Sequence, residues 1–367
     1  MNFDAHIYGP FFSSLGVGIS TRAFWKLLTL HGLKVGIWPQ SNPIGDFEKT
    51  IANKYKEFIV QNEHPKLNFF RINADEISRS PISRMSSTAA INLLVPFWET
   101  SHLPSVWHLE VQKFSGVVAA TTFIASAFSD AIRDKPIFVF THPIEVEKVS
   151  SEESSVLQTF STQSYFLYSF AYSSYVSRKQ PEKFLELAEI YRHVNLASSS
   201  TFILASGDKP KSETDHKVAE RFRKSESRSF KYLEGPRDRL QHISLMQNAD
   251  LFVSMHRSEG IGLQLAESVL LDTPVVSHTY SGPSDFLSED IPGNFGYNLV
   301  DIKLGEYPEV FKDYWAEFDL HEVIRAMDIA LAAEPRTNNQ IKDKVSSHFS
   351  LERNCVLLDK MLKDLLT

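Results

Sequence analysis

Two glutamates stand eight positions apart in the stretch "HRSEGIGLQLAES", residues 256–268, with a pair of glycines between them. Glu259 lies shortly after the apolar run "LFVSM", residues 251–255, and His256, Arg257 and Ser258 stand between them. Glu267 lies inside the apolar stretch "IGLQLAESVLL". Ionised carboxylates accept hydrogen bonds from hydroxyl groups and pair with cations. These residue types therefore indicate a site for a polar ligand.

The same stretch has the pattern of a strand, a turn and a helix. The run "LFVSM" predicts the strand, residues 256–260 the turn and residues 261–271 the helix. Ligands in open α/β sheets bind at the carboxyl ends of the strands, and the free N–H groups of a helix start favour an anion such as phosphate. Gly260 and Gly262 permit close approach of the backbone to that anion.

The second glutamate of the pair has two interpretations. Glu267 is expected on the apolar face of the helix, near Leu263 and Leu270. A carboxylate there needs partners, because an isolated buried charge is costly. It either makes an internal hydrogen bond to the backbone or a buried basic residue, or accepts hydrogen bonds from ligand hydroxyls such as those of a ribose. Geometry alone favours the internal partner.

A basic pair forms a further candidate site. Arg178 and Lys179 stand before Gln180 and Pro181, and proline is well suited to the first turn of the helix that follows. Two adjacent cations repel each other unless an anion joins them. The pair is either solvated, which is the commoner case in proteins, or part of a phosphate site.

A glycine turn near the start of the chain resembles the beginning of a dinucleotide fingerprint. Gly16 and Gly18 precede an expected helix, but Thr21 stands where the third glycine would be. The next expected strand ends in Gln40 instead of the acid that holds the ribose of NAD. The third glycine and the acid that an NAD-dependent oxidoreductase needs are therefore both missing. The turn is instead interpreted as a flexible one, suited to face a phosphate or a substrate.

The sequence lacks the motifs of several common metal-binding and catalytic sites. There is no Asp-x-Asp, no His-Glu-x-x-His, no G-x-S-x-G and only one cysteine, Cys355, so neither a metal site nor a cofactor is expected. His6, His102, His108, His142 and His256 are scattered singly, and only those at the ends of strands are candidates for a functional role.

The elements that must position these residues alternate between strands and helices. In the first half, helical stretches such as "GISTRAFWKLLTLHG" separate the expected strands "FDAHIYG", "KVGIWP", "LNFFRI", "AINLLVPF", "GVVAAT" and "PIFVFT". In the second half, expected helices at 181–192, 213–224, 237–247 and 261–271 separate "SYFLYSFAY", "STFILASGD", "SFKYL", "LFVSM" and "PVVSH". This alternation predicts an α/β protein with two doubly wound parallel sheets.

The polar stretch "THPIEVEKVSSEESS" separates the two halves and is expected to be a linker. We therefore predict a first domain over residues 1–143 and a second over residues 144–348. The amphipathic tail, residues 349–367, is expected to form a helix that packs back on the first domain.

Composition limits the class of protein and its location. With 367 residues, 43% of them hydrophobic and 23% charged, the chain is globular, and its net charge of -7 argues against a nucleic-acid binder. No signal peptide or membrane span is apparent, so the expected location is the cytoplasm. The first domain is less acidic than the second, which allows peripheral contact with the inner face of the membrane.

Together these stretches resemble the retaining, nucleotide-sugar-dependent glycosyltransferases of family four, the group 1 transferases with the GT-B fold. "HRSEGIGLQLAE" resembles the E-x7-E motif of that family, and "DTPVVSHTYSGPSDFL" follows at a similar distance. "SRKQP" resembles its basic segment, "PFWETSHLPSVW" a cleft loop of its N-terminal domain, and "YWAEFD" and "HFSLERN" its C-terminal landmarks. The resemblance implies two Rossmann-like domains that face a cleft.

The resemblance also implies roles for these residues. Glu259 would hold hydroxyls of the donor sugar and Glu267 the ribose, while Lys179 would neutralise the diphosphate with Arg178 or Arg257 as helpers. Ser173 stands where many members carry an arginine, which places more of that charge on Lys179 and Arg257. The backbone implied to contact sugar and diphosphate comprises Gly260, Ile261, Gly262 and Leu263. In the first domain the implied residues are Gly16, Gly18 and a cleft side chain, for which Glu99 is favoured over His102 as the catalytic residue.

The function implied is that of a metal-independent hexosyltransferase. It would move a hexose from a nucleoside diphosphate sugar to the hydroxyl of a saccharide or lipid-linked saccharide, in polysaccharide or glycoconjugate synthesis, with no other cofactor. Two alternatives remain: a sugar-nucleotide epimerase of the same fold, and a non-catalytic protein that binds nucleotide sugars.

Overall fold

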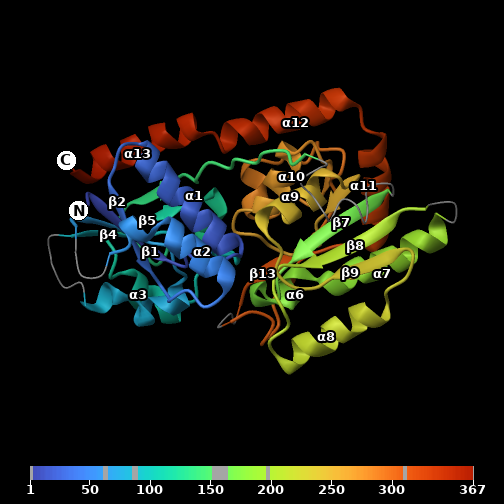
Figure 1. Ribbon diagram of the computed structural model, residues 1–367, viewed down its shortest axis with the longest axis horizontal. Helices are drawn as coiled ribbons and strands as arrows, with labels where there is room; N and C mark the ends of the chain where they lie inside the picture. Colours follow the sequence, from blue (N-terminus) through green and yellow to red (C-terminus); the bar gives the residue numbers. More distant parts are fainter. Residues whose placement is uncertain are drawn as a thin grey trace. The chain divides into compact units, whose positions relative to one another are not determined.

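The structure is a computed structural model, and it describes residues 3–60, 65–84, 90–150, 164–195, 199–308 and 312–366 (Figure 1). The chain forms two compact units. The first combines residues 1–144 with residues 347–367, and the second comprises residues 145–346.

The first unit is built on a sheet of six parallel strands, in the order β2-β1-β3-β4-β5-β6. The chain runs from β1 outward to β2 and then returns to the other side of β1, so the strand order reverses between β1 and β3. The six segments that the sequence predicts as strands all form them. They are β1 (Ala5–Gly9), β2 (Val35–Pro39), β3 (Leu67–Phe70), β4 (Ile91–Leu94), β5 (Gly116–Ala119) and β6 (Ile137–Val139).

The helices of the first unit cover this sheet because their apolar faces need burial. Phe24, Leu27 and Leu28 of one helix and Leu358 and Met361 of another are all at most 1% exposed and belong to one core cluster. The C-terminal helix therefore packs beside α1 (Figure 1). The helices are α1 (Gly16–Leu30), α2 (Asp46–Lys54), α3 (His108–Val111), α4 (Thr122–Phe128) and α13 (Leu351–Leu366).

The second unit is built on a sheet of five parallel strands, in the order β11-β10-β7-β8-β9. Here the strand order reverses between β7 and β10, as in dinucleotide-binding folds. Four of the five strands are buried along their whole length, which explains their mostly apolar sequences. The strands are β7 (Tyr165–Phe170), β8 (Thr201–Ser206), β9 (Phe230–Leu233), β10 (Leu251–Val253) and β11 (Val275–Val276).

The helices of the second unit begin and end at recognisable signals. The helix predicted at 213–224 is confirmed, and Ser212 and Asp215 form a capping box at its start. The helix predicted from residue 261 begins two residues later, because Gly262 has a φ of 86° and cannot be helical. The helices are α6 (Val176–Lys179), α7 (Pro181–Val194), α8 (Glu213–Lys224), α9 (Arg239–Gln247), α10 (Leu263–Leu270), α11 (Leu320–Ala332) and α12 (Pro335–His348).

A small antiparallel hairpin in the second unit does not appear among the predicted elements. It consists of β12 (Asn298–Asp301) and β13 (Tyr314–Glu317). Trp315 on this hairpin is fully buried against Ile302 and Tyr307. The strands are short and the connection between them is long, so no compact turn sequence marks the hairpin.

The first and the last segment of the second unit both contact the same side chain. The carboxylate of Asp272 lies 2.6 Å from the Nζ atoms of both Lys148 and Lys342. Lys148 follows the first crossing of the chain between units, and Lys342 precedes the second. One side chain therefore holds both segments.

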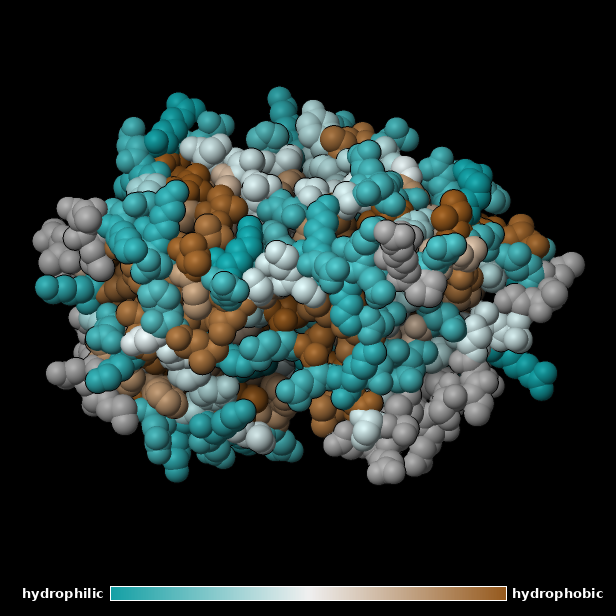
Figure 2. Space-filling model, turned by 90° about the horizontal axis from the view of Figure 1, so that it is seen from above, coloured by the Kyte–Doolittle hydropathy of each residue, from teal (hydrophilic) through white to brown (hydrophobic). Residues whose placement is uncertain are grey.

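Hydrophilic side chains cover much of the face drawn in Figure 2, with hydrophobic groups between them. In the described part of the chain, no helix combines the length and the apolar character that crossing a membrane requires.

Candidate functional site

The loops that follow β7 and β10 meet at the carboxyl edge of the second sheet, where the strand order reverses. The first loop carries Arg178 and Lys179, and the second carries Glu259, 80 positions further along the chain. Lys179 Nζ donates a hydrogen bond to Glu259 Oε1, and Arg178 Nη1 lies 3.3 Å from Glu259 Oε2. The fold thus joins two of the stretches that the sequence identifies separately.

This three-residue cluster carries one excess positive charge. The side chains of Arg178, Lys179 and Glu259 are 3%, 13% and 16% exposed. Burial alone would raise the pKa of Glu259, but the two cations hold it at about 2. The glutamate is therefore ionised near neutral pH, and two cations share its single negative charge. An anion that enters beside Lys179 would complete the balance.

Main-chain contacts fix the positions of these side chains. Arg178 Nη1 donates to the carbonyl of Ser258 at 2.7 Å, and the N–H of Arg257 donates to the carbonyl of Arg178 at 2.8 Å. Tyr175 and Gln180, on either side of the short helix α6, have φ values of 63° and 46°. Such backbone conformations are unfavourable for residues other than glycine and are maintained by surrounding contacts. The basic pair is held in place before any ligand binds.

The turn that carries Glu259 packs tightly against residues 281–282. The N–H of Glu259 donates to Ser281 Oγ, and the N–H of Gly282 donates to the carbonyl of Glu259, both at 2.9 Å. A Cβ atom at Gly282 would lie 2.1 Å from the carbonyl oxygen of Gly260. Gly282 is therefore required for the shape of the turn, a role that the sequence reasoning did not assign to it.

The predicted backbone contacts form the entry to α10. Gly260, Ile261 and Gly262 are buried, and Leu263 is the half-buried first residue of the helix. The left-handed conformation of Gly262 directs the chain from the strand edge into the helix.

Glu267 has an internal partner. It is 4% exposed, and its Oε1 atom lies 2.5 Å from Nη2 of Arg239, in the first turn of α9. The geometric argument favoured such an internal basic partner, although Arg239 is half-buried, with 30% of its side chain exposed. Among the described residues, none donates a hydrogen bond to Glu267 Oε2, so this atom retains acceptor capacity.

Arg257, a predicted helper of Lys179, faces the hairpin. Its Nε and Nη2 atoms both donate to Glu317 Oε2, Nε at 3.1 Å. Its Nη1 atom lies 3.5 Å from Glu306 Oε1. It also stacks over the ring of Trp315, 4.5 Å from the centroid. Its charge is thus compensated by two carboxylates in this structure.

Two buried histidines support the same turn, and the sequence reasoning did not pair them. The rings of His256 and His278 are 4.4 Å apart, and His278 Nε2 donates to the carbonyl of His256 at 2.6 Å. Burial lowers the pKa of His278 to about 4 and that of His256 well below its usual range. Both rings are therefore neutral, and they link the loops after β10 and β11.

The candidate residues of the first unit lie at the carboxyl edge of its own sheet. Gly16, which is exposed, begins α1, and a Cβ atom at Gly18 would lie 2.0 Å from the carbonyl oxygen of Ser13. Half-buried Glu99 and exposed His102 both lie in the loop that follows β4.

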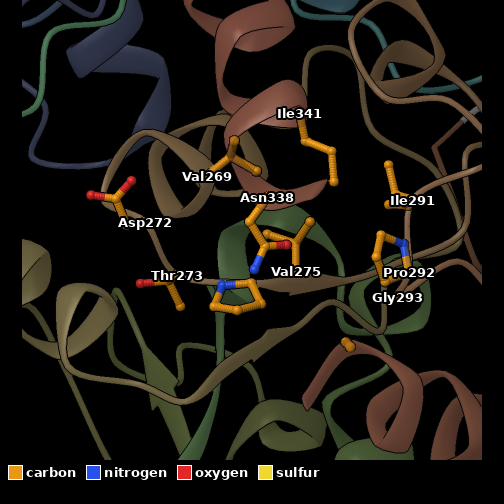
Figure 3. A pocket seen from close by; sticks show the side chains of 11 residues that line it. Val269, Asp272, Thr273, Val275, Ile291, Pro292, Gly293, Asn338 and Ile341 are labelled. Carbon is orange, nitrogen blue, oxygen red and sulfur yellow. The ribbon is translucent and has the colours of Figure 1, made fainter. Parts of the chain in front are cut away.

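A pocket elsewhere in the second unit lies apart from this cluster (Figure 3). Val269, Val275, Ile291 and Ile341 supply much of its lining. Pro274, which also lines it, precedes β11, so the pocket lies at the amino edge of the sheet and the Glu259 cluster at the carboxyl edge.

The low pKa of Glu259 leads to a prediction about stability in acid. Its folded pKa of about 2 lies below its usual 4.5, so its contribution is present above that usual value and is lost as the pH falls toward 2. We expect this group to account for about 3 kcal/mol of unfolding free energy lost between about pH 5 and pH 2. Denaturant titrations at a series of pH values measure the loss, which should be smaller in Glu259→Gln. An equal loss in that variant would contradict the prediction.

Within the described ranges, no three His, Cys, Asp or Glu side chains are placed to hold a metal ion, and the metal independence implied by the resemblance stays a prediction.

Comparison with known proteins gives no match by sequence: no protein-family model and no curated protein matches this chain. Solved structures match it over nearly its full length. Sucrose-phosphate synthase from Thermosynechococcus elongatus is similar with a TM-score of 0.68 and 11% identity, over 99% of each chain. HepE from Anabaena, in complex with UDP and glucose, is similar with a TM-score of 0.62 and 15% identity, over 99% of this chain and 100% of its own. The trehalose-6-phosphate synthase OtsA is similar with a TM-score of 0.65 and 10% identity, over 99% of each chain. The chain has the GT-B fold, with two Rossmann-like domains.

Proposed function

We propose that this protein is a retaining glycosyltransferase, similar to those of family four, that transfers a hexose from a nucleoside diphosphate sugar to an acceptor hydroxyl. The observation that carries the proposal is the cluster of Lys179, Arg178 and Glu259 at the strand reversal of the second sheet. Nucleotides bind at this position in related folds. The structural neighbours with bound UDP and glucose, or with a fluorinated UDP-glucose, support a nucleotide sugar as the donor.

Each member of the cluster has a part in this proposal. Lys179, which is 13% exposed, would contact the diphosphate. Arg178 is almost fully buried and bonds the main chain of the turn, so it would contribute charge and position Glu259 without contacting the donor directly. Glu259 would accept hydrogen bonds from hydroxyls of the donor sugar.

The reaction breaks the bond between the anomeric carbon and the diphosphate oxygen and forms a bond from that carbon to the acceptor oxygen. The departing diphosphate gains negative charge, which Lys179 and the buried positive charge behind it would stabilise. The acceptor's proton can pass to a phosphate oxygen of the leaving group, so this route needs no protein base. The acceptor is proposed to be a saccharide or a lipid-linked saccharide.

Glu267 is proposed to bind the ribose of the donor through its free carboxylate oxygen. Arg239 would keep the carboxylate oriented. We expect Glu267→Gln to raise KM for the nucleotide sugar about tenfold or more with little change in kcat, because the contact is to a part of the donor that does not react. The exposed Glu220→Gln is the control. A fall in kcat at unchanged KM would contradict the assignment.

A thermal-shift screen with UDP-, GDP- and ADP-sugars tests the proposed function. A ligand that binds only the folded protein raises its melting temperature by mass action, so one nucleotide class should stabilise the protein selectively. No stabilisation by any nucleotide sugar would contradict the proposal. Incubation of the selected donor alone distinguishes the alternatives: an isomerised sugar would indicate an epimerase, and binding without turnover in the presence of acceptors a non-catalytic protein.

A further inference from the structure

The first unit contains a buried arginine without a carboxylate partner. Arg71 follows β3 directly and is 1% exposed. Among the described residues, no aspartate or glutamate forms an ion pair with it. Arginine is almost never fully buried unless it is paired, because removing its charge from water is costly. Its surroundings must therefore either compensate this charge or leave it for a ligand.

The groups that contact Arg71 are neutral. Its Nη2 atom donates to Ser20 Oγ, and Ser20 Oγ lies 2.7 Å from Nε2 of His142. His142 Nδ1 donates to the carbonyl of Pro143 at 3.1 Å, so Nε2 accepts from the serine hydroxyl. Burial, reinforced by the charge of Arg71, lowers the pKa of His142 to about 3, so this ring is uncharged.

Two aromatic rings also contact the Arg71 guanidinium, but they do not accept hydrogen bonds from all of its nitrogens. The ring centroids of Phe97 and Phe24 lie 4.2 Å and 5.3 Å from Cζ, the central carbon of the Arg71 guanidinium. Arg71 Nε is buried without a hydrogen-bond partner, and no described residue accepts from Nη1. Two of the three nitrogens therefore lack an acceptor, although arginine is well suited to bind carboxylate and phosphate groups.

The place of Arg71 in the fold is one where ligands bind. Its N–H donates to the carbonyl of Tyr8 at 2.7 Å, which extends the pairing of β1 with β3. A Cβ atom at Gly9 would lie 2.9 Å from Cβ of Arg71, so glycine is needed for this close packing. The strand order of the first sheet reverses between these two strands, and the carboxyl edge at such a reversal is the usual ligand position in open α/β sheets.

We infer that Arg71 receives an oxyanion, a phosphate or a carboxylate, carried by the sugar acceptor. This rests on the proposed function, which assigns the donor diphosphate to the cations of the second unit and leaves the acceptor to the first. The half-buried ring of Phe97 stacks on the guanidinium and lies in the loop after β4, so a shift of this ring would admit the anion. The acceptor is then an acidic sugar or a sugar phosphate.

Binding to the full chain without nucleotide tests this inference. Thermal shifts are measured with glucose 6-phosphate, glucuronate, glucose and inorganic phosphate at equal ionic strength. We expect one or both of the acidic sugars to stabilise the protein and glucose not to. Arg71→Gln should weaken this binding at least tenfold, and Arg79→Gln, which removes an arginine that is 73% exposed, should leave it unchanged.

Three results would overturn the inference. The first is the absence of stabilisation by either acidic sugar in the unmodified protein, and the second is stabilisation by inorganic phosphate alone. The third is equal binding in Arg71→Gln or, if that variant does not fold, in Arg71→Met, which removes the charge and keeps an unbranched side chain. These measurements include no donor. If the proposed function fails instead, nucleotide sugars will not stabilise the protein while acidic sugars still do.

Discussion

Replacement of Lys179 by alanine is expected to lower turnover with the selected nucleotide sugar about 100- to 1000-fold while the protein stays folded. The magnitude follows from the loss of one preorganised charged donor at a leaving group, about 3 to 4 kcal/mol of transition-state stabilisation. The fold should persist because Arg178 Nη1 remains 3.3 Å from the carboxylate of Glu259 and continues to compensate it.

Steady-state rates of sugar transfer measure this effect, and circular dichroism of the variant verifies its fold. Lys217→Ala is the matched control, because among the described residues Lys217 pairs only with Glu213 on the surface of α8 and its side chain is 71% exposed. Turnover in Lys179→Ala within about threefold of the unmodified protein would remove the main support for this site.

Replacement of Gly282 by alanine is expected to disrupt the turn that carries Glu259. The new Cβ atom would meet the carbonyl oxygens of Gly260 at 2.1 Å and Glu259 at 2.8 Å, and both are backbone atoms that cannot rotate away. The turn must move, which we expect to destabilise the fold by about 2 to 3 kcal/mol. Displacement of Glu259 and Gly260 should also lower turnover at least about tenfold, since misplacement by about 1 Å can cost about 100-fold.

Chemical denaturation and transfer rates measure the two parts of this prediction. Gly45→Ala is the control, because a Cβ atom there meets nothing within 4 Å and the residue precedes α2 in the other unit. A Gly282→Ala protein with unchanged stability and unchanged turnover would show that the turn tolerates the extra atom.

Much of the fold could be predicted from the sequence because the two sheets are parallel and buried. Strands such as β7 and β8 contain no charged residue and alternate with helices that have clear starts, as at Ser212. The prediction that Glu259 and the Arg178–Lys179 pair act together relied on a resemblance. Their contact follows from the strand order, which joins β7 to β10 and which local patterns do not reveal.

The features that the sequence did not reveal depend on contacts between distant segments. Gly282 is one of 15 glycines, and only the packing of its Cα against Gly260 distinguishes it. His256 and His278 stand 22 positions apart, and neither has a neighbour that suggests a pair. The partners of Arg257 lie on a hairpin whose strands are too short to predict, so its ion pair with Glu317 could not be anticipated.

The ion pairs at Asp272 bear on how such a protein can be rebuilt. Because Lys148 and Lys342 bond the same carboxylate, residues 145–346 enter and leave their host chain at adjacent points, as an inserted domain does. An insertion of this kind can be exchanged as a cassette through two short joints without rearranging the sheet that hosts it. Under the proposed function, a chimera with the second unit of a related protein would take its donor preference from the inserted segment and its acceptor preference from the host.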